Sequence, residues 1–394
     1  MNIDEFEEVV KTGLRRYATG SPGNQLENIM LGAPWKPWYK RAWDGIRIVY
    51  NVLTTRAPWL GWPLFEVLCG KRPFHNVGIK KNGEQIEILC SATDIGNNRT
   101  IAFCNKQRSA RRYFKNPRDG EYEIIYDDKD LRLMTHHVGF YSSALPCFGP
   151  YPEFPPDGVR YDYEIPTVLA DGGWSCALPT ELINWKPDEG PQPIIVTLNK
   201  ADIVRPTAST PTVPPLNPNL NSWIGYYKSL LTAVLLDMGN DDVNAFIMDG
   251  ASEDQIVNIT PEMQADAQYS DEPWFTDDPL DAFDFFEVTN ERSDKAFEFG
   301  KFYVVKWVND LRQRADGTDA DAVSAKGIID RLSSDGIVLI LSSGGVRGAV
   351  LAGIICALIR EFGQDSIKAI AGTSMGAVMA MWMADTIARH PIDS

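Results

Sequence analysis

The chain has 394 residues, 44% of them hydrophobic and 11% aromatic, which allows a large core and excludes an intrinsically disordered protein. Its formal net charge of −15 argues against nucleic-acid binding, because that role needs a basic face that contacts phosphates. No run reaches the roughly 20 apolar residues of a membrane-spanning helix and no basic, apolar leader opens the chain, so we expect a cytoplasmic protein.

Residues 30–72 form a block with a composition of its own. Basic side chains outnumber acidic ones there, although the whole chain is acidic. Tryptophan together with Lys and Arg is typical of a segment at a membrane interface, and it also fits a helical cap whose aromatic side chains pack on the core. Both interpretations stay open, and the first would make the protein peripheral at membranes. The tryptophans of the block are Trp35, Trp38, Trp43, Trp59 and Trp62.

Strand and helix patterns alternate after this block. Strands are indicated by short apolar or alternating runs, helices by apolar residues at a spacing of three to four, and a loop by clustered prolines. In chain order we expect a strand and its hairpin partner within 84–104, strands at 121–126 and 191–198, a proline-rich loop at 206–218, a helix at 221–236, a strand at 255–259, a helix at 297–314 and a connector at 313–335.

Residues 336–394 predict a parallel β–α–β unit. Residues 336–341 are continuously apolar, as in a strand that is buried on both faces. A glycine turn and a helix at 350–362 follow, then a second strand at 367–371 and a helix at 375–389. This order favours an α/β fold with a parallel sheet.

A G-x-S-x-G motif lies between the second of these strands and its helix. It consists of Gly372, Thr373, Ser374, Met375 and Gly376. The flanking glycines allow a tight turn that projects the serine hydroxyl near a helix N-terminus, where a base can remove its proton. Ser374 is therefore the candidate nucleophile.

A glycine-rich loop follows the first of these strands. Acyl transfer places negative charge on a carbonyl oxygen, and the backbone N–H groups of such a loop, with the positive end of the next helix, stabilise that charge. We expect Arg347 to orient the loop. A nucleotide-binding loop is disfavoured, because neither G-K-[ST] nor G-x-G-x-x-G is present. The candidate oxyanion hole consists of Gly344, Gly345, Val346, Arg347 and Gly348.

Potential metal ligands are scattered along the chain. The six cysteines form no C-x-x-C pair, and the four histidines form no H-E-x-x-H motif. We expect reduced thiols, no metal and no other cofactor.

The glycine loop and the serine motif together resemble the nucleophile block of the patatin-like phospholipases. That family uses a Ser–Asp dyad, and its aspartate lies in a D-G-G or D-G-A motif well after the serine. Nothing after Ser374 supplies this motif, but three earlier segments resemble successive parts of the family's second half. They are residues 87–94 (Glu-Ile-Leu-Cys-Ser-Ala-Thr-Asp), residues 141–146 (Tyr-Ser-Ser-Ala-Leu-Pro) with Phe148 and Pro150, and residues 169–174 (Leu-Ala-Asp-Gly-Gly-Trp) with Leu178 and Pro179.

The chain therefore resembles a circularly permuted patatin. The resemblance implies one domain over 1–394 with a three-layer α/β/α fold and a mainly parallel sheet. Residues 1–312 would hold the family's second part, 313–335 the join, and 336–394 the nucleophile block. Ends that lie close at a surface can be joined, and a loop opened, without altering a core. The sequence leaves open whether the permutation is natural or engineered.

The resemblance also implies the catalytic partner and the reaction. Asp171 would accept the proton of Ser374, and Gly172 and Gly173 would let the loop aim its carboxylate. The implied activity is that of an esterase or phospholipase A, which cleaves a lipid or a small carboxylic ester through an acyl-Ser374 intermediate without a cofactor.

Three alternatives remain. A histidine could complete a triad through His136 or His137, although we expect both on a strand or loop. Ser343 stands where the family has the first of three glycines, so a catalytically impaired lipid-binding or scaffolding protein is conceivable if that position needs a positive φ. An acyltransferase on a related fold would favour a histidine next to the nucleophile, where this chain has Thr373.

Overall fold

The structure is a computed structural model, and part of the chain is described. The tryptophan-rich block up to residue 68, the predicted loop at 206–218, the predicted helix at 221–236 and residues 145–150 lie outside the described residues. The described residues are 1–19, 69–115, 122–126, 133–144, 153–154, 167–187, 189–198, 239, 241–259, 263, 271 and 288–392.

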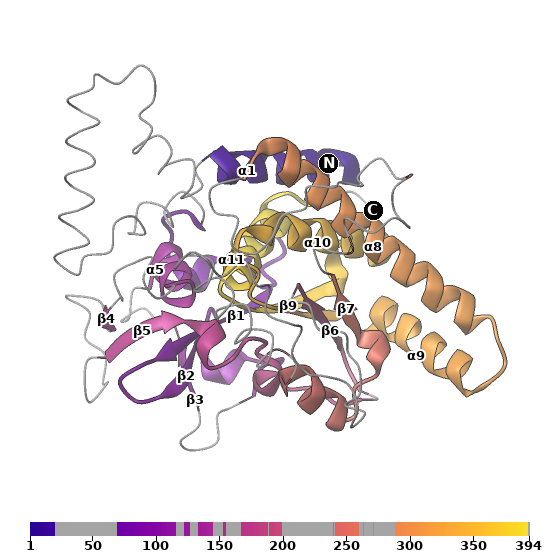
Figure 1. The fold of residues 1–394 in the computed structure, drawn as a ribbon, viewed down its shortest axis with the longest axis horizontal. Coiled ribbons are helices and arrows are strands. Elements are labelled where there is room, and N and C mark those ends of the chain that lie inside the picture. Colours follow the sequence, from indigo (N-terminus) through magenta and orange to yellow (C-terminus); the bar gives the residue numbers. More distant parts are fainter. Residues whose placement is uncertain are drawn as a thin grey trace, which may run out of the picture.

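A mixed, mostly parallel sheet forms the centre of an α/β fold (Figure 1). Its strands lie in the order β3-β2-β1-β9-β8-β6-β7, while β5 pairs with β1 and β4 pairs with β5. Five adjacent strands, β1, β9, β8, β6 and β7, run parallel to one another. The strands β2 and β5 run antiparallel to β1. The bounds are β1 Glu87–Asp94, β2 Arg99–Cys104, β3 Tyr122–Tyr126, β4 Glu153–Phe154, β5 Thr167–Asp171, β6 Gln192–Thr197, β7 Ile256–Asn258, β8 Ile337–Leu341 and β9 Ile367–Thr373.

The predicted strands are confirmed where the structure describes them. The hairpin expected within 84–104 is β1 and β2, and the three strands expected further along are β3, β6 and β7. In β8, Ile337, Leu339 and Leu341 join the core on one face of the sheet, while Val338 and Ile340 join the core on the other. This burial on both faces explains why the sequence of β8 is continuously apolar.

Helices cover the sheet. Side chains of α1, α5, α8, α10 and α11 belong to the same core as one face, and residues 178–183 and the helical residues 241–248 cover the other. The predicted helices at 297–314, 350–362 and 375–389 are confirmed as α8, α10 and α11. The bounds are α1 Ile3–Thr19, α5 Thr135–Ser142, α8 Asn290–Ala315, α9 Ala320–Ser334, α10 Gly348–Phe362 and α11 Met375–Arg389.

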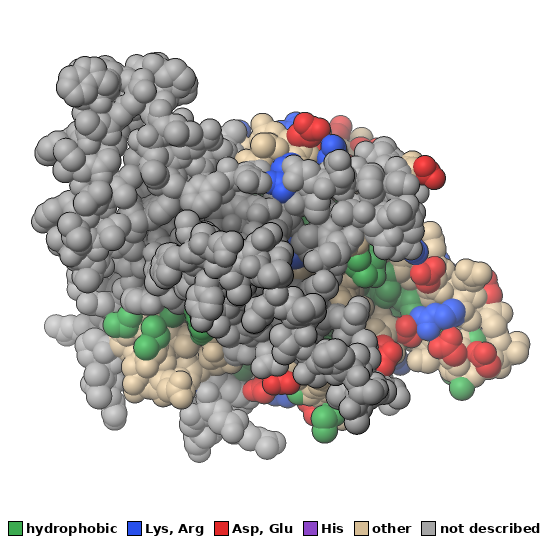
Figure 2. Space-filling model, in the orientation of Figure 1, with side chains coloured by type: hydrophobic (Ala, Val, Ile, Leu, Met, Phe, Trp, Pro, Cys, Tyr) green, Lys and Arg blue, Asp and Glu red, His purple; other side chains and the backbone are tan. Residues whose placement is uncertain are grey.

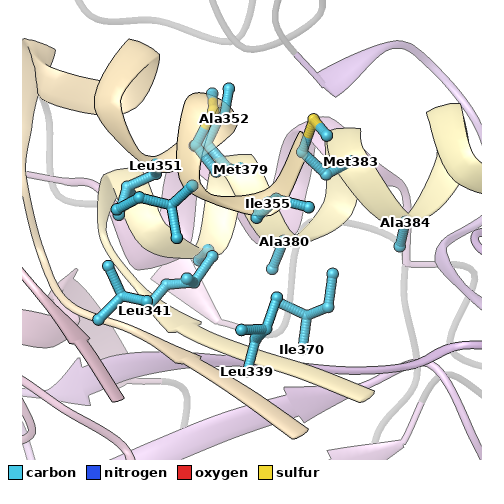
Figure 3. Close-up of a cluster of buried hydrophobic side chains, with 14 of the residues drawn as sticks. Leu339, Leu341, Leu351, Ala352, Ile355, Ile370, Met379, Ala380, Met383 and Ala384 are labelled. Carbon is cyan, nitrogen blue, oxygen red and sulfur yellow. The ribbon is translucent and has the colours of Figure 1, made fainter. Parts of the chain in front are cut away.

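The helices α10 and α11 pack directly over β8 and β9. The small residues Ala380 and Ala384 let α11 approach the sheet closely. This close packing fixes the position of the start of α11 relative to the end of β9. Figure 3 shows Leu351, Ala352 and Ile355 of α10 and Met379, Ala380, Met383 and Ala384 of α11 above Leu339, Leu341 and Ile370 of the strands.

The segment 313–335, predicted to be a connector, contains the end of α8 and the whole of α9. Asp319 caps α9, because its side chain accepts a hydrogen bond from the N–H of Ala322 at 2.9 Å. Arg314 pairs with Asp321 at 3.1 Å across the turn, in the region where Figure 2 shows mixed acidic and basic side chains. The connection between α8 and β8 is thus a capped helix with an ion-paired turn.

The first helix belongs to the same core as the nucleophile block. Phe6, Val10 and Leu14 of α1 are fully buried against that core. The amino group of Met1 donates to the carbonyl oxygen of Pro391 at 3.2 Å, so the start of α1 lies beside the residues that follow α11 (Figure 1).

Candidate active site

Ser374 lies in a tight turn between β9 and α11, as the G-x-S-x-G motif predicts. Its φ of 55° and ψ of −122° are rare for a residue with a side chain. Such a conformation costs about 1–3 kcal/mol and persists only where the surroundings impose it. A Cβ on Gly376 would lie 2.5 Å from the carbonyl oxygen of Leu341, and one on Gly372 would lie 2.3 Å from the carbonyl carbon of Gly376. Both glycines are therefore required by close packing.

The strand pairing of β1 brings Asp171 to Ser374. The first residues of β1 pair with β9, whose last residue, Thr373, lies opposite Ser91. The next residue, Ala92, lies opposite Asp171, the last residue of β5. Since β9 runs parallel to β1 and β5 runs antiparallel to it, the C-terminal ends of β9 and β5 meet along one edge of β1. Ser374, the predicted nucleophile, directly follows the end of β9, and Asp171, the predicted base, is the last residue of β5.

The two side chains are in direct contact. The Ser374 hydroxyl donates to Asp171 Oδ2 at 2.6 Å. The N–H of Gly173 donates to the other oxygen, Oδ1, at 2.8 Å and fixes the orientation of the carboxylate. A Cβ on Gly172 would lie 2.4 Å from the carbonyl oxygen of Ser91, so the loop needs glycine there to approach β1. The requirement for glycine is thus shown at Gly172, whereas Gly173 contributes its backbone N–H.

Burial raises the pKa of Asp171 from 3.8 to about 6, against hydrogen bonds from Ser374 and Gly173 that lower it. Only 1% of Asp171 and 6% of Ser374 is exposed, so the charged form of the carboxylate loses most of its hydration. A carboxylate with a pKa near 6 is ionised at neutral pH and is a stronger base than an ordinary aspartate.

Further hydrogen bonds hold the turn, and they involve residues to which the sequence analysis gave no role. The N–H of Ser374 donates to Ser142 Oγ at 3.0 Å. The hydroxyl of Thr373 donates to the carbonyl oxygen of Cys176 at 2.9 Å and lies 2.5 Å from Ser91 Oγ. Ser91 and Ser142 both fall in segments quoted for the family resemblance, which was the only signal that could have singled them out.

The glycine loop lies next to this turn. A Cβ on Gly348 would lie 3.0 Å from Sδ of Met375, the residue after the nucleophile. Arg347 is buried, and its N–H donates to the carbonyl oxygen of Gly344 at 3.0 Å. Its Nε approaches the same oxygen at 3.4 Å. These contacts support the predicted role of Arg347 in shaping the loop, and they bring the start of α10 to the nucleophile.

Ser343 does not have the conformation that would make it a defect. The positive φ of the loop is at Gly345, with a value of 53°, and Ser343 has no positive φ. A serine at this position therefore carries no backbone strain of that kind. The Ser343 hydroxyl is buried and has no hydrogen-bond partner within the described part of the chain.

The histidine alternative finds no support at the site. His136 and His137 lie on the helix α5, so the expectation that they lie on a strand or loop is wrong. Within the described residues, the Ser374 hydroxyl donates to the Asp171 carboxylate, whose other oxygen accepts from the N–H of Gly173, so the partner of the serine is Asp171 and neither histidine.

Neither a metal site nor a membrane-spanning helix is found in the described residues. No group of three or more His, Cys, Asp or Glu side chains there could hold a metal ion. In the same residues no helix is both long and apolar enough to cross a bilayer. Of the tryptophan-rich block, only residues 69–72 are described, so both interpretations of it stay predictions.

Comparisons of the chain with models of known protein families, with curated proteins and with solved structures found no match. The resemblance to the patatin-like phospholipases thus stays a prediction from the sequence motifs. The case for a function depends on the chemistry that the site geometry allows.

Proposed function

We propose that the protein is a serine hydrolase that cleaves carboxylic esters of lipids. The observation that carries this proposal is the 2.6 Å hydrogen bond from the Ser374 hydroxyl to the Asp171 carboxylate. A nucleophile in hydrogen-bond contact with a base, whose other oxygen is oriented by a third group, is the arrangement that activates a serine. Here the third group is the N–H of Gly173.

The reaction follows from these contacts. Asp171 accepts the proton of Ser374 while Oγ attacks the ester carbonyl carbon, and the tetrahedral intermediate collapses to an acyl-serine. The departing alcohol takes the proton from Asp171. Water then loses a proton to Asp171 and attacks the acyl-serine. The carboxylic acid departs, and Ser374 Oγ takes the proton back from Asp171, which restores both groups.

The negative charge of the intermediate needs donors other than the N–H of Ser374. That N–H is engaged by Ser142, so it is not available to an oxyanion. We assign the oxyanion hole to N–H groups of the loop from Gly344 to Gly348 other than that of Arg347, which donates to the Gly344 carbonyl oxygen. This loop lies against Met375 at the start of α11. The N-termini of α10 and α11 add partial positive charge to the same place.

The proposed fold is a circularly permuted, three-layer patatin-like one. The swapped order of the motif blocks supports it, and so does the way β9 and β5 approach each other along β1. Both strands are held by β1, so the order in which the chain reaches them does not determine the geometry of the dyad. Unrelated hydrolases likewise build the same catalytic group from different chain orders.

The test is hydrolysis of short p-nitrophenyl esters by the wild-type protein and by Ser374→Ala and Asp171→Asn. We expect both variants to lose activity by at least about a thousandfold, because each removes a member of the nucleophile–base pair. Variants that hydrolyse the esters as fast as the wild type would exclude the dyad. Stoichiometric capture of a fluorophosphonate at Ser374, lost in Ser374→Ala, would exclude a catalytically inert protein.

A panel of esters, from short acyl chains to phospholipid vesicles, identifies the substrate. Preference for vesicles would support contact between a membrane surface and the tryptophan-rich block at 30–72. Activity on short esters alone would favour the block as a cap. Transfer of the acyl group to an added alcohol in preference to water would favour an acyltransferase.

A further inference from the structure

The backbone N–H of Ser374 needs a partner that its neighbouring elements do not supply. β9 ends at Thr373 and α11 begins at Met375. The carbonyl oxygen of Ser374 accepts from the N–H groups of Ala377 and Val378 in α11, but its own N–H precedes the helix and has no acceptor there. A buried N–H without a partner costs free energy comparable to a lost hydrogen bond. The hydroxyl of Ser142 accepts a hydrogen bond from this N–H at 3.0 Å.

The hydroxyl of Ser142 is fixed from both sides. It donates to the carbonyl oxygen of Ser91 at 2.6 Å, and Ser142 is 0% exposed. A carbonyl oxygen can only accept and a backbone N–H can only donate, so the direction of both hydrogen bonds is determined. Ser142 therefore links the backbone of the nucleophile to a defined point on β1.

That point is where the strands of the nucleophile and the base meet. Ser91 lies opposite Thr373, and the following residue of β1, Ala92, lies opposite Asp171. Ser142 thus connects Ser374 by hydrogen bonds to β1, the strand that also pairs with β5 at Asp171. This connection spans three elements that are distant in sequence, namely α5, β1 and the turn before α11.

We propose that Ser142 is a positioning residue whose hydroxyl holds Ser374 in the positive-φ conformation in which Oγ meets Asp171. This inference rests on the proposed hydrolase function. Ser142 acts through the backbone of Ser374 and not on the substrate. Without this connection, the strained turn relaxes and Oγ moves away from the carboxylate. A displacement of about 1 Å of a reacting group reduces the rate on the order of 100-fold.

A second effect distinguishes this role from a packing role. The hydrogen bond from Ser374 lowers the pKa of Asp171 against the rise caused by burial. When that hydrogen bond weakens, the pKa of Asp171 rises. The acidic limb of the kcat/KM profile then moves to higher pH, which a simple loss of folded protein would not produce.

The experiment compares Ser142→Ala with Ser143→Ala. Ser143 is a matched control, because it is the next residue and its buried hydroxyl has no hydrogen-bond partner within the described part of the chain. The readouts are the rate of fluorophosphonate reaction at Ser374, kcat and KM for a p-nitrophenyl ester across pH, and circular dichroism. For Ser142→Ala we expect a 10- to 100-fold lower rate, KM within about twofold and a shifted acidic limb. Ser143→Ala should match the wild type.

Ser142→Thr covers the case in which the alanine variant does not fold, because threonine keeps the hydroxyl. It should retain most of the reactivity, and a folded Ser142→Thr as slow as Ser142→Ala would overturn the inference. A folded Ser142→Ala with wild-type rate and an unshifted acidic limb would also overturn it, while the proposed function would stand. Failure of the wild type to react at Ser374 would overturn the proposed function and this inference with it.

Discussion

Replacing Asp171 by asparagine is expected to stabilise the folded protein at neutral pH while it abolishes catalysis. Burial raises the pKa of Asp171 from 3.8 to about 6, so the ionised carboxylate is less favourable in the folded chain than in the unfolded one. At roughly 1.4 kcal/mol per pKa unit, this difference corresponds to about 3 kcal/mol. Asparagine stays neutral, and its side-chain oxygen can still accept a hydrogen bond from Gly173.

The pH dependence gives the sign of the effect. Below pH 3.8 the carboxyl is protonated in both states, and above about 6 it is ionised in both. Between these values the folded state binds more protons, so the stability of the wild type falls as pH rises. We therefore expect the gain from Asp171→Asn to be larger by about 2 kcal/mol at pH 7.5 than at pH 4.5.

Urea unfolding at these two pH values, followed by tryptophan fluorescence, measures the gain. Asp94→Asn is the matched control, because Asp94 is also buried but pairs with Arg99 at 3.3 Å and accepts from Asn97 at 2.7 Å. Its replacement should reduce stability at pH 7.5. The reasoning is refuted if Asp171→Asn lowers stability at pH 7.5, or if its gain is the same at both values.

Three further outcomes are expected. The kcat/KM of ester hydrolysis should fall as pH decreases through about 6, where Asp171 becomes protonated, and a flat profile from pH 5 to 8 would contradict its role as base. Gly172→Ala should destabilise the protein by about 1–3 kcal/mol in thermal unfolding, because its Cβ would lie 2.4 Å from the carbonyl oxygen of Ser91. Ser343→Gly should change the fluorophosphonate reaction rate by less than about threefold, since Ser343 has no positive φ, and a larger gain would show that the serine impairs the loop.

The parts of the fold that the sequence predicts are those with a local pattern. The buried strand β8 is continuously apolar, and the turn at Ser374 has glycines at the positions where close packing excludes a Cβ. Asp171 has no such local signal, because an Asp-Gly-Gly turn is common. Only its likeness to a family segment, at a position far from Ser374 in sequence, made it a candidate.

The features that the sequence did not predict have physical causes. The helix α5 is buried on nearly all sides, so it lacks the apolar and polar faces by which a helix is identified, and its two histidines were not expected there. The helix α9 has a composition rich in aspartate and alanine that also fits a loop, and the cap at Asp319 is what favours the helix. The link between Ser142 and Ser374 depends on the placement of three distant elements, which no local pattern encodes.

The position of β8 and β9 in the sheet has a consequence for synthesis on the ribosome. These strands come last in the chain among the strands described, yet they lie between β1 and β6, which are made much earlier. Until residues 337–373 leave the ribosome, the edges of β1 and β6 that later pair with β9 and β8 are open to pairing with other chains, which exposes the nascent protein to aggregation. Insertion of the two strands closes the sheet and completes the Ser374–Asp171 pair in the same event. The proposed hydrolase activity would therefore be absent until the segment from β8 to Ser374 has been made and inserted.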